Sequence, residues 1–128
     1  MVSEDYLSLK TARLLKENGF NIPCLAYYDD HEDFFIDMDN LPNSELPDRY
    51  CAAPTIQVAM KWLREDRKIF AYPEFNPYDD YHYWGFTIYR LEFTNPHHSI
   101  ICASQNHWYK TYEDAAEGAI IYCIINKL

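Results

Sequence analysis

The chain has 128 residues, and with 48% hydrophobic and 24% charged side chains it is too apolar to be a disordered acidic tail. The length favours one domain over residues 1–128, because two separate cores would each be marginally small. No apolar run approaches the roughly 20 residues that a membrane span needs. The first residues lack the basic and apolar regions of a signal peptide. We therefore expect a soluble, cytoplasmic protein without a membrane partner.

The negative charge is concentrated in the first part of the chain. The net charge is −9; residues 1–50 contain 4 basic and 11 acidic side chains, whereas residues 51–128 contain 7 and 9. From Asp29 to Asp48 there are eight carboxylates and no Lys or Arg. Such a stretch repels polyanions and membrane surfaces, and it attracts basic partners. A solvated loop that serves solubility is the simpler interpretation.

The four cysteines lie far apart in the sequence, without the close pairs that zinc or redox sites use. A chain of this length without an export signal does not need disulfides for stability. We therefore expect four free and mostly buried thiols: Cys24, Cys51, Cys102 and Cys123.

The first predicted elements are a helix and a hairpin. The helix covers Leu7 to Asn18, with Ser8 as its N-cap and Gly19 as its left-handed stop. Two short aromatic and apolar strands, Cys24 to Tyr28 and Phe34 to Met38, flank a polar loop, as in a hairpin.

The second helix, over residues 55–66, has the clearest pattern in the chain, and Pro54 fits its first turn. One face is apolar at helical spacing, through Ile56, Ala59, Met60 and Leu63. The opposite face forms a small basic stripe, in which Lys61 can pair with Glu65. The stripe comprises Gln57, Lys61, Arg64 and Lys68.

Three strands are predicted next. They are Ile69 to Tyr72, which Pro73 should stop, then Tyr81 to Phe93, and then Ser99 to Ser104. The middle strand is apolar on both faces, so it should be central or covered on both sides through its middle. Gly85 within it marks a bulge or a close approach of the backbone.

The last helix is predicted over residues 112–126. Thr111 and Asp114 form a weak version of the reciprocal N-terminal cap. Gly118 and the neighbouring alanines allow this helix to lie close against a sheet. Its core-facing side chains are Ala116, Ala119, Ile120, Cys123 and Ile124.

These elements predict the α+β class. The order is α-β-β-α-β-β-β-α, and strands that follow one another with short connections favour an antiparallel sheet over a parallel one. We expect a sheet of three to five strands with three helices packed on it.

Three segments carry a resemblance: Leu9 to Phe20, Cys51 to Thr55 running into Lys61 to Glu65, and Thr111 to Ala115. They resemble small uncharacterised proteins of Bacteroides-group bacteria and their phages or mobile elements. The resemblance covers nearly the whole chain. It implies a habitat, a prophage or integrated element in a gut anaerobe, but it implies no activity. The similar proteins have a shorter and plainer segment where this chain has Tyr72 to Tyr83.

An RNA-binding module is one alternative, because residues 55–126 have the element order of a double-stranded RNA-binding domain. The basic stripe would then contact the minor groove. Those domains bind phosphates at the start of the last helix, where this chain has Glu113 and Asp114. The charge therefore disfavours nucleic acid as a partner, and a solvated helix face explains the stripe better.

Several residues have the chemistry of metal or catalytic groups without the required spacing. His97, His98, Cys102 and His107 are possible metal ligands, and Cys102 with His107 could be a nucleophile and base. A buried thiol near loop histidines is the simpler interpretation. Asp29, His31 and Asp33 alternate like the opening of a calcium loop, and so do Asp37 and Asp39. In the first set, however, Phe34 stands where the sharp turn requires glycine, and in the second Leu41 stands at the fifth ligand position. The sequence thus predicts no catalytic residue, no metal site and no cofactor.

The most unusual local composition is an aromatic and acidic segment between residues 72 and 84. Tyrosine and tryptophan provide large contact areas at low entropic cost, so such a segment suits protein binding. Packing of these rings into or over the sheet is the competing interpretation. The predicted contact residues are Tyr78, Asp79, Asp80, Tyr81 and Trp84.

The sequence therefore predicts a small non-enzymatic accessory protein of a phage or mobile element, which binds another protein through an acidic, aromatic surface. One alternative is an acidic mimic of nucleic acid, which would inhibit a host enzyme through the carboxylates between Asp29 and Asp48. The RNA-binding module is the other alternative. Salt dependence separates the mimic from the rest, because exposed charge pairs are screened by salt.

Overall fold

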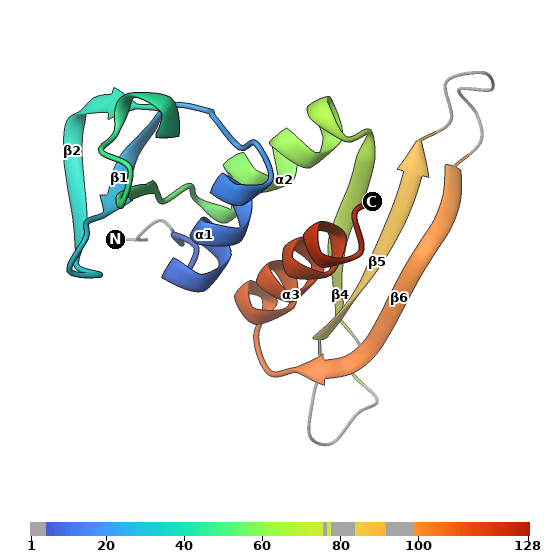
Figure 1. Ribbon diagram of the computed structural model, residues 1–128. Coiled ribbons are helices and arrows are strands. Elements are labelled where there is room, and N and C mark those ends of the chain that lie inside the picture. Colours follow the sequence, from blue (N-terminus) through green and yellow to red (C-terminus); the bar gives the residue numbers. More distant parts are fainter. Residues whose placement is uncertain (1–4, 76, 78–83, 92–98) are drawn as a thin grey trace. The chain divides into compact units, whose positions relative to one another are not determined.

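The computed structural model describes residues 5–75, 77, 84–91 and 99–128, and its side-chain description leaves out 91 and 99–108 (Figure 1). The chain divides into two compact units, Met1–Ala59 and Met60–Leu128, and each is described by itself. The helix α2 (Ile56–Asp66) contains the boundary. The prediction of a single domain over residues 1–128 stays a prediction.

The first unit contains a three-stranded antiparallel sheet in the order β2-β1-β3. Its strands are β1 (Cys24–Tyr28), β2 (Phe34–Leu41) and the two-residue β3 (Cys51–Ala52). A short 3-10 helix, η1 (Asn43–Glu45), connects β2 to β3. The strand β1 is central, and its Ala26 is fully buried. The strand β2 is therefore an edge strand of this sheet.

A tight turn joins β1 to β2. The N–H of Asp29 donates to the carbonyl of Asp33 at 3.0 Å, and the Asp29 carboxylate accepts from the N–H groups of His31 and Asp33, both at 2.9 Å. Glu32 closes the turn in the left-handed region, with a φ of 68°. Three-residue hairpin loops commonly end on such a residue, usually glycine.

The helix α1 (Leu9–Glu17) begins at Ser8 and ends before Gly19, as predicted. Gly19 has a φ of 91°, and its N–H donates to the carbonyl of Lys16. This left-handed stop is the usual way for glycine to end a helix. The buried face of α1 contains Thr11, Ala12 and Leu15.

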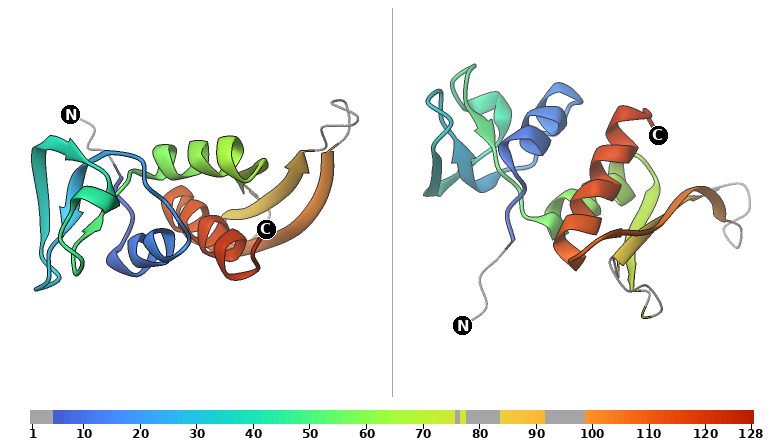
Figure 2. Two further views of the ribbon diagram at one scale, coloured as in Figure 1. Left: turned by 45° about the horizontal axis from the view of Figure 1, so that its top comes forward. Right: turned by 90° about the horizontal axis from the view of Figure 1, so that it is seen from below.

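The second unit contains an antiparallel sheet in the order β4-β5-β6 with α3 on one face (Figure 2). The strands are β4 (Ile69–Phe75), β5 (Trp84–Leu91) and β6 (Ser99–Tyr109). In the central strand β5, Gly85, Phe86, Thr87 and Ile88 are all buried. The expectation of a middle strand covered on both faces is confirmed. The register of β5 with β6 shifts between Trp84 and Phe86. Gly85 therefore lies at an irregularity of the pairing, as the sequence predicts.

The helix α3 (Tyr112–Ile125) has the predicted cap and core face. The Thr111 hydroxyl accepts from the N–H of Asp114 at 3.1 Å. Gly118 lies directly under the ring of Tyr109, which occupies the space of a β-carbon. The small residue is therefore required by close contact with the end of β6. All five predicted core side chains of this helix are buried, from Ala116 to Ile124.

The predicted α+β class and element order are confirmed, with β3 as an additional short strand. The strands form two sheets where the sequence predicts one. Pro73 does not stop β4; it pairs with Phe86, and the strand continues to Phe75. An edge strand tolerates proline because one side of its backbone needs no partner strand. The strand β2 likewise extends past the predicted Met38 to Leu41.

Candidate functional site

The structure describes one of the five predicted contact residues, Trp84. This side chain is half-buried between two rings. Its ring centroid is 5.1 Å from that of Phe75 and 5.4 Å from that of Tyr112, which it meets edge-on at 89°. Trp84 therefore packs against α3 and the end of β4. The other four predicted residues lie outside the described residues: Tyr78, Asp79, Asp80 and Tyr81.

Another part of the predicted aromatic segment packs along the sheet of the second unit. The ring of Tyr72 stacks on that of Tyr89, with centroids 5.9 Å apart and planes 8° apart. Phe70 lies beside Tyr72 at 5.4 Å. Hydrogen bonds with Tyr89 and then with Glu74 raise the pKa of the Tyr72 phenol. These contacts give the rings a structural role in the pairing of β4 with β5.

The possible metal and nucleophile residues receive little support from the described part of the chain. His97 and His98 lie outside it, as do the side chains of Cys102 and His107 on β6. No group of three or more potential metal-binding side chains occurs among the described residues. The carboxylate of Asp29 binds backbone N–H groups of its own turn, which explains its spacing to Asp33 without calcium.

The basic stripe on α2 is largely occupied by local contacts. Lys61 Nζ lies 3.9 Å from the Glu65 carboxylate, which confirms the predicted pair. The ammonium group of Lys68 donates to the carbonyl of Glu65 at 2.6 Å. Just outside the stripe, Arg67 lies over the ring of Trp62 at 5.0 Å. These contacts fit the solvated helix face better than a row of cations directed at phosphates.

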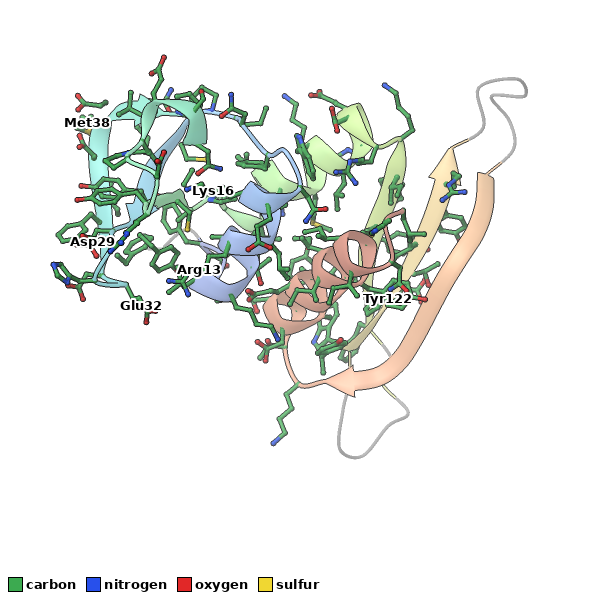
Figure 3. The ribbon with its side chains drawn as sticks, in the orientation of Figure 1. Arg13, Lys16, Asp29, Glu32, Met38 and Tyr122 are labelled. Atoms are coloured by element: carbon green, nitrogen blue, oxygen red, sulfur yellow. The ribbon has the colours of Figure 1, made fainter. Side chains whose placement is uncertain are left out.

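The acidic stretch is folded as a hairpin with exposed apolar side chains. We call residues 24–41, which comprise β1, the turn and β2, the acidic hairpin. Ile36 is 62% exposed and Met38 is 84% exposed, although both are large apolar residues. Phe34 and Phe35 are also exposed in part. In Figure 3, Met38 lies toward one end of β2, and Asp29 and Glu32 lie at the turn at the other end.

A ladder of three rings lies on one face of this hairpin. Phe35 stacks on Tyr27 with centroids 5.6 Å apart, and Tyr27 stacks on Tyr50 at the same distance. The planes differ by 26° and 15°. Alternation along β2 puts Asp33 and Asp37 on the same face as Phe35. This face therefore combines aromatic rings with carboxylates.

A cavity of about 90 Å³ opens beside the ladder. Partial burial, and then the nearby carboxylates of Asp30 and Asp29, raise the pKa of the Tyr50 phenol. Ring faces and carboxylates together attract cationic groups such as an ammonium or a guanidinium. The cavity is lined by Cys24, Tyr27, Asp37, Asp39, Asn40, Leu41, Leu46 and Tyr50.

The cations of the first unit do not neutralise most of this negative charge. Arg13 pairs with Glu32 at 3.1 Å, near the turn. The ammonium group of Lys16 donates to the backbone carbonyls of Asp48 and Tyr50, at 2.5 and 2.6 Å. Within the described parts of the chain, no ion pair of 4.0 Å or less involves the β2 side of the hairpin, which contains Asp33, Asp37 and Asp39.

The described thiols are free, as predicted. Cys51 and Cys123 are buried, and Cys24 is partly buried. Burial raises the pKa of the Cys24 thiol to about 11. Burial also raises the pKa of Cys51, although the positive charges of Lys16 and Arg13 act in the opposite direction. The raised pKa of Cys24 lowers the thiolate fraction of this side chain at neutral pH.

The predicted contact residues, which include Asp79 and Asp80, lie in a different segment from the acidic stretch of residues 29–48. The sequence does not predict the exposed apolar residues among the carboxylates of the hairpin. A signal was present: Ile36, Asp37, Met38 and Asp39 alternate apolar and acidic residues. That alternation is typical of a strand with two different faces, but it does not reveal which apolar side chains stay uncovered.

Comparison of the chain with protein-family models, with curated proteins and with solved structures finds no match. None of the described helices is both long and apolar enough to cross a membrane.

Proposed function

We propose that this chain is a non-enzymatic binding module whose acidic hairpin binds a basic segment of another protein. One observation carries the proposal: Ile36 and Met38 on β2 are exposed between the carboxylates of Asp37 and Asp39 on the same strand and of Asp33, which directly precedes it. A role as an accessory protein of a phage or mobile element is part of the proposal, and it rests on the sequence resemblance alone.

Exposed apolar side chains favour a protein partner over the role of a nucleic-acid mimic. A polyanion mimic needs regularly spaced charges, whereas exposed Ile36 and Met38 leave apolar area in contact with water. Grouped exposed apolar residues with a polar rim are typical of protein-binding surfaces.

The charge of the hairpin determines the chemistry of the partner. Carboxylates without neighbouring cations accelerate association with basic surfaces and repel acidic ones. Tyr27 is stacked on both sides, so the two end rings of the ladder, Phe35 and Tyr50, add a favourable environment for lysine or arginine side chains. A segment that contains both basic and apolar residues therefore matches the surface.

Three synthetic peptides of about eight residues test the proposed chemistry. One alternates lysine with valine, the second lysine with serine, and the third glutamate with valine. We expect the lysine and valine peptide to bind the full chain about tenfold more tightly than the lysine and serine peptide, as measured by fluorescence anisotropy. The glutamate peptide should not bind. Equal binding of the two lysine peptides would instead support a purely electrostatic mimic.

Matched variants locate the binding surface. Asp39→Lys should weaken binding of the lysine and valine peptide about tenfold, whereas Asp66→Lys changes the charge equally in the other unit and should have little effect. Ile36→Ser should also weaken binding, and Ile125→Ser is its control, because Ile125 is 61% exposed at the end of α3. Equal effects of each variant and its control would contradict the assignment to the hairpin.

A further inference from the structure

The free edge of β2 has backbone groups available for pairing, and hydrogen bonds in the first unit show which ones. The N–H of Ala53 donates to the carbonyl of Ala26 at 2.9 Å, so the backbone groups of Ala26 face β3. Successive residues of a strand direct these groups to opposite sides. Those of Tyr27 therefore face β2, and they meet Phe35, its register partner.

The turn gives the same result independently. The carbonyl of Asp33 accepts from the N–H of Asp29, so the backbone groups of Asp33 also face β1. Alternation then directs the N–H and carbonyl groups of Phe34 and Ile36 away from β1. No other described strand of the first unit pairs with β2 on that side.

The same alternation separates the side chains of this edge into two chemical faces. Asp33, Phe35 and Asp37 lie on one face, and Phe34 and Ile36 lie on the other. Beyond Ile36 the pairing with β1 is irregular. The next paired residues are Cys24 and Leu41, so β1 advances by two residues where β2 advances by five. Regular pairing with β1 therefore covers Phe34 to Ile36, and Asp33 and Asp37 flank this edge at its two ends.

We infer that the edge of β2 from Phe34 to Ile36, flanked by Asp33 and Asp37, pairs with an extended segment of the partner, in which lysine or arginine alternates with apolar residues. This inference rests on the proposed function and specifies its binding mode. The basic side chains lie beside Asp33 and Asp37, and the apolar ones lie beside Phe34 and Ile36. Strand addition supplies main-chain hydrogen bonds for affinity and alternate side chains for specificity.

Charge complementarity favours this partner over a second copy of the chain. If β2 edges of two copies paired with Phe34 opposite Ile36, Asp33 would lie opposite Asp37 at both ends. Like charges directly across a ladder destabilise pairing, and charged side chains are a common means of protecting edge strands. A basic segment converts the same two positions into opposite-charge pairs.

Sequence order within the peptide tests strand addition directly. The alternating lysine and valine peptide is compared with a block peptide of the same composition, in which all lysines precede all valines. Strand addition predicts that the alternating peptide binds the full chain about tenfold more tightly. Equal affinities would overturn strand addition, yet both peptides would still bind if the proposed function is correct. Binding of neither peptide would overturn both.

Two substitutions of one residue separate the backbone from the side chain. Ile36→Pro removes an N–H from the free edge without removing a bond to β1, whereas Ile36→Ala removes only side-chain area. We expect a loss of about tenfold or more for proline and a clearly smaller loss for alanine. If both variants have the melting temperature of the natural chain and lose the same peptide affinity, the inference is overturned.

Amide hydrogen exchange in the natural chain gives the same test without a substitution. Before the peptide is added, the Phe34 and Ile36 amides should exchange rapidly and the Phe35 amide slowly. Saturation with the alternating peptide should slow Phe34 and Ile36. Unchanged exchange at both residues in the saturated complex would overturn strand addition. Light scattering of the chain alone is the final control: a dimer that Ile36→Pro dissociates would assign the edge to a second copy and would also overturn the inference.

Discussion

Glu32 occupies a backbone conformation that a residue with a β-carbon adopts at a cost. Its φ of 68° lies in the left-handed region, where glycine is unstrained. Its ion pair with Arg13 joins two side chains that are 62% and 51% exposed, and such pairs contribute little to stability. The conformational strain should therefore outweigh the ion pair.

Glu32→Gly should increase the free energy of unfolding by about 0.5–1 kcal/mol, because it relieves this strain. Urea denaturation of the natural chain and the variant measures the difference. Glu32→Gln is the control, because it loses the ion pair and keeps the strain. A variant with glycine that is less stable than the one with glutamine would show that the turn does not adopt this conformation.

Cys24 provides a test at the level of a single thiol. A pKa of about 11 lies about two units above the ordinary value, so the thiolate fraction at neutral pH is about a hundredfold lower than in a free cysteine. Alkylation of Cys24 by iodoacetamide, followed by mass spectrometry, should be slower by about that factor. Because the raised pKa favours the protonated form, the rate should rise about tenfold per pH unit up to about pH 10. A rate that levels off around pH 9, as expected for an exposed cysteine, would contradict the burial of this thiol.

Single residues show where sequence reasoning works and where it stops. The roles of Gly19, Thr111 and Gly118 were predictable because caps and close contacts depend on local chemistry. The role of Pro73 was misjudged, because its effect depends on the position of β4 at the edge of a sheet. Strand order is a property of the fold and is not visible in the neighbouring residues.

At the level of elements, the contact between α3 and β6 decides how an alanine at position 118 would affect stability. Alanine would favour the helix, but its methyl group would collide with β6. Alanine in place of glycine within a helix normally stabilises by about 1 kcal/mol. At Gly118, however, the new methyl group would overlap the ring of Tyr109. Displacement of this half-buried ring should cost more than the propensity gain.

We therefore expect Gly118→Ala to lower the melting temperature of the natural chain. The same substitution in a Tyr109→Ala background should raise it, because the ring is absent and about 1 kcal/mol of propensity remains. This double-mutant cycle is measured by thermal unfolding. Identical effects of Gly118→Ala in both backgrounds would mean that the ring does not pack over the glycine.

The elements were more predictable than the surfaces that they form. Apolar periodicity placed all three helices within two residues of their observed ends. The hairpin was also predictable, but its function depends on which side chains remain exposed. The burial of Ala26 and the exposure of Ile36, its register partner, arise because β1 is central and β2 is at the edge.

At the level of the whole molecule, charge and apolar exposure coincide in the first unit. The sequence shows the excess of carboxylates between Asp29 and Asp48, and the structure adds the uncovered apolar side chains among them. The described rings of the second unit contact one another along its sheet and against α3, and Phe75 among them is 56% exposed. The contact surface predicted around Trp84 stays a prediction, because its other four residues lie outside the described residues. The described residues favour the hairpin for the proposed binding surface.

The most direct test of this account is an NMR titration of the full, isotopically labelled chain with the alternating lysine and valine peptide. The account predicts that the largest changes in amide chemical shift occur in β1 and β2, around Tyr27 and from Asp33 to Asp39. Changes centred on Trp84 and α3, with none in the hairpin, would contradict it.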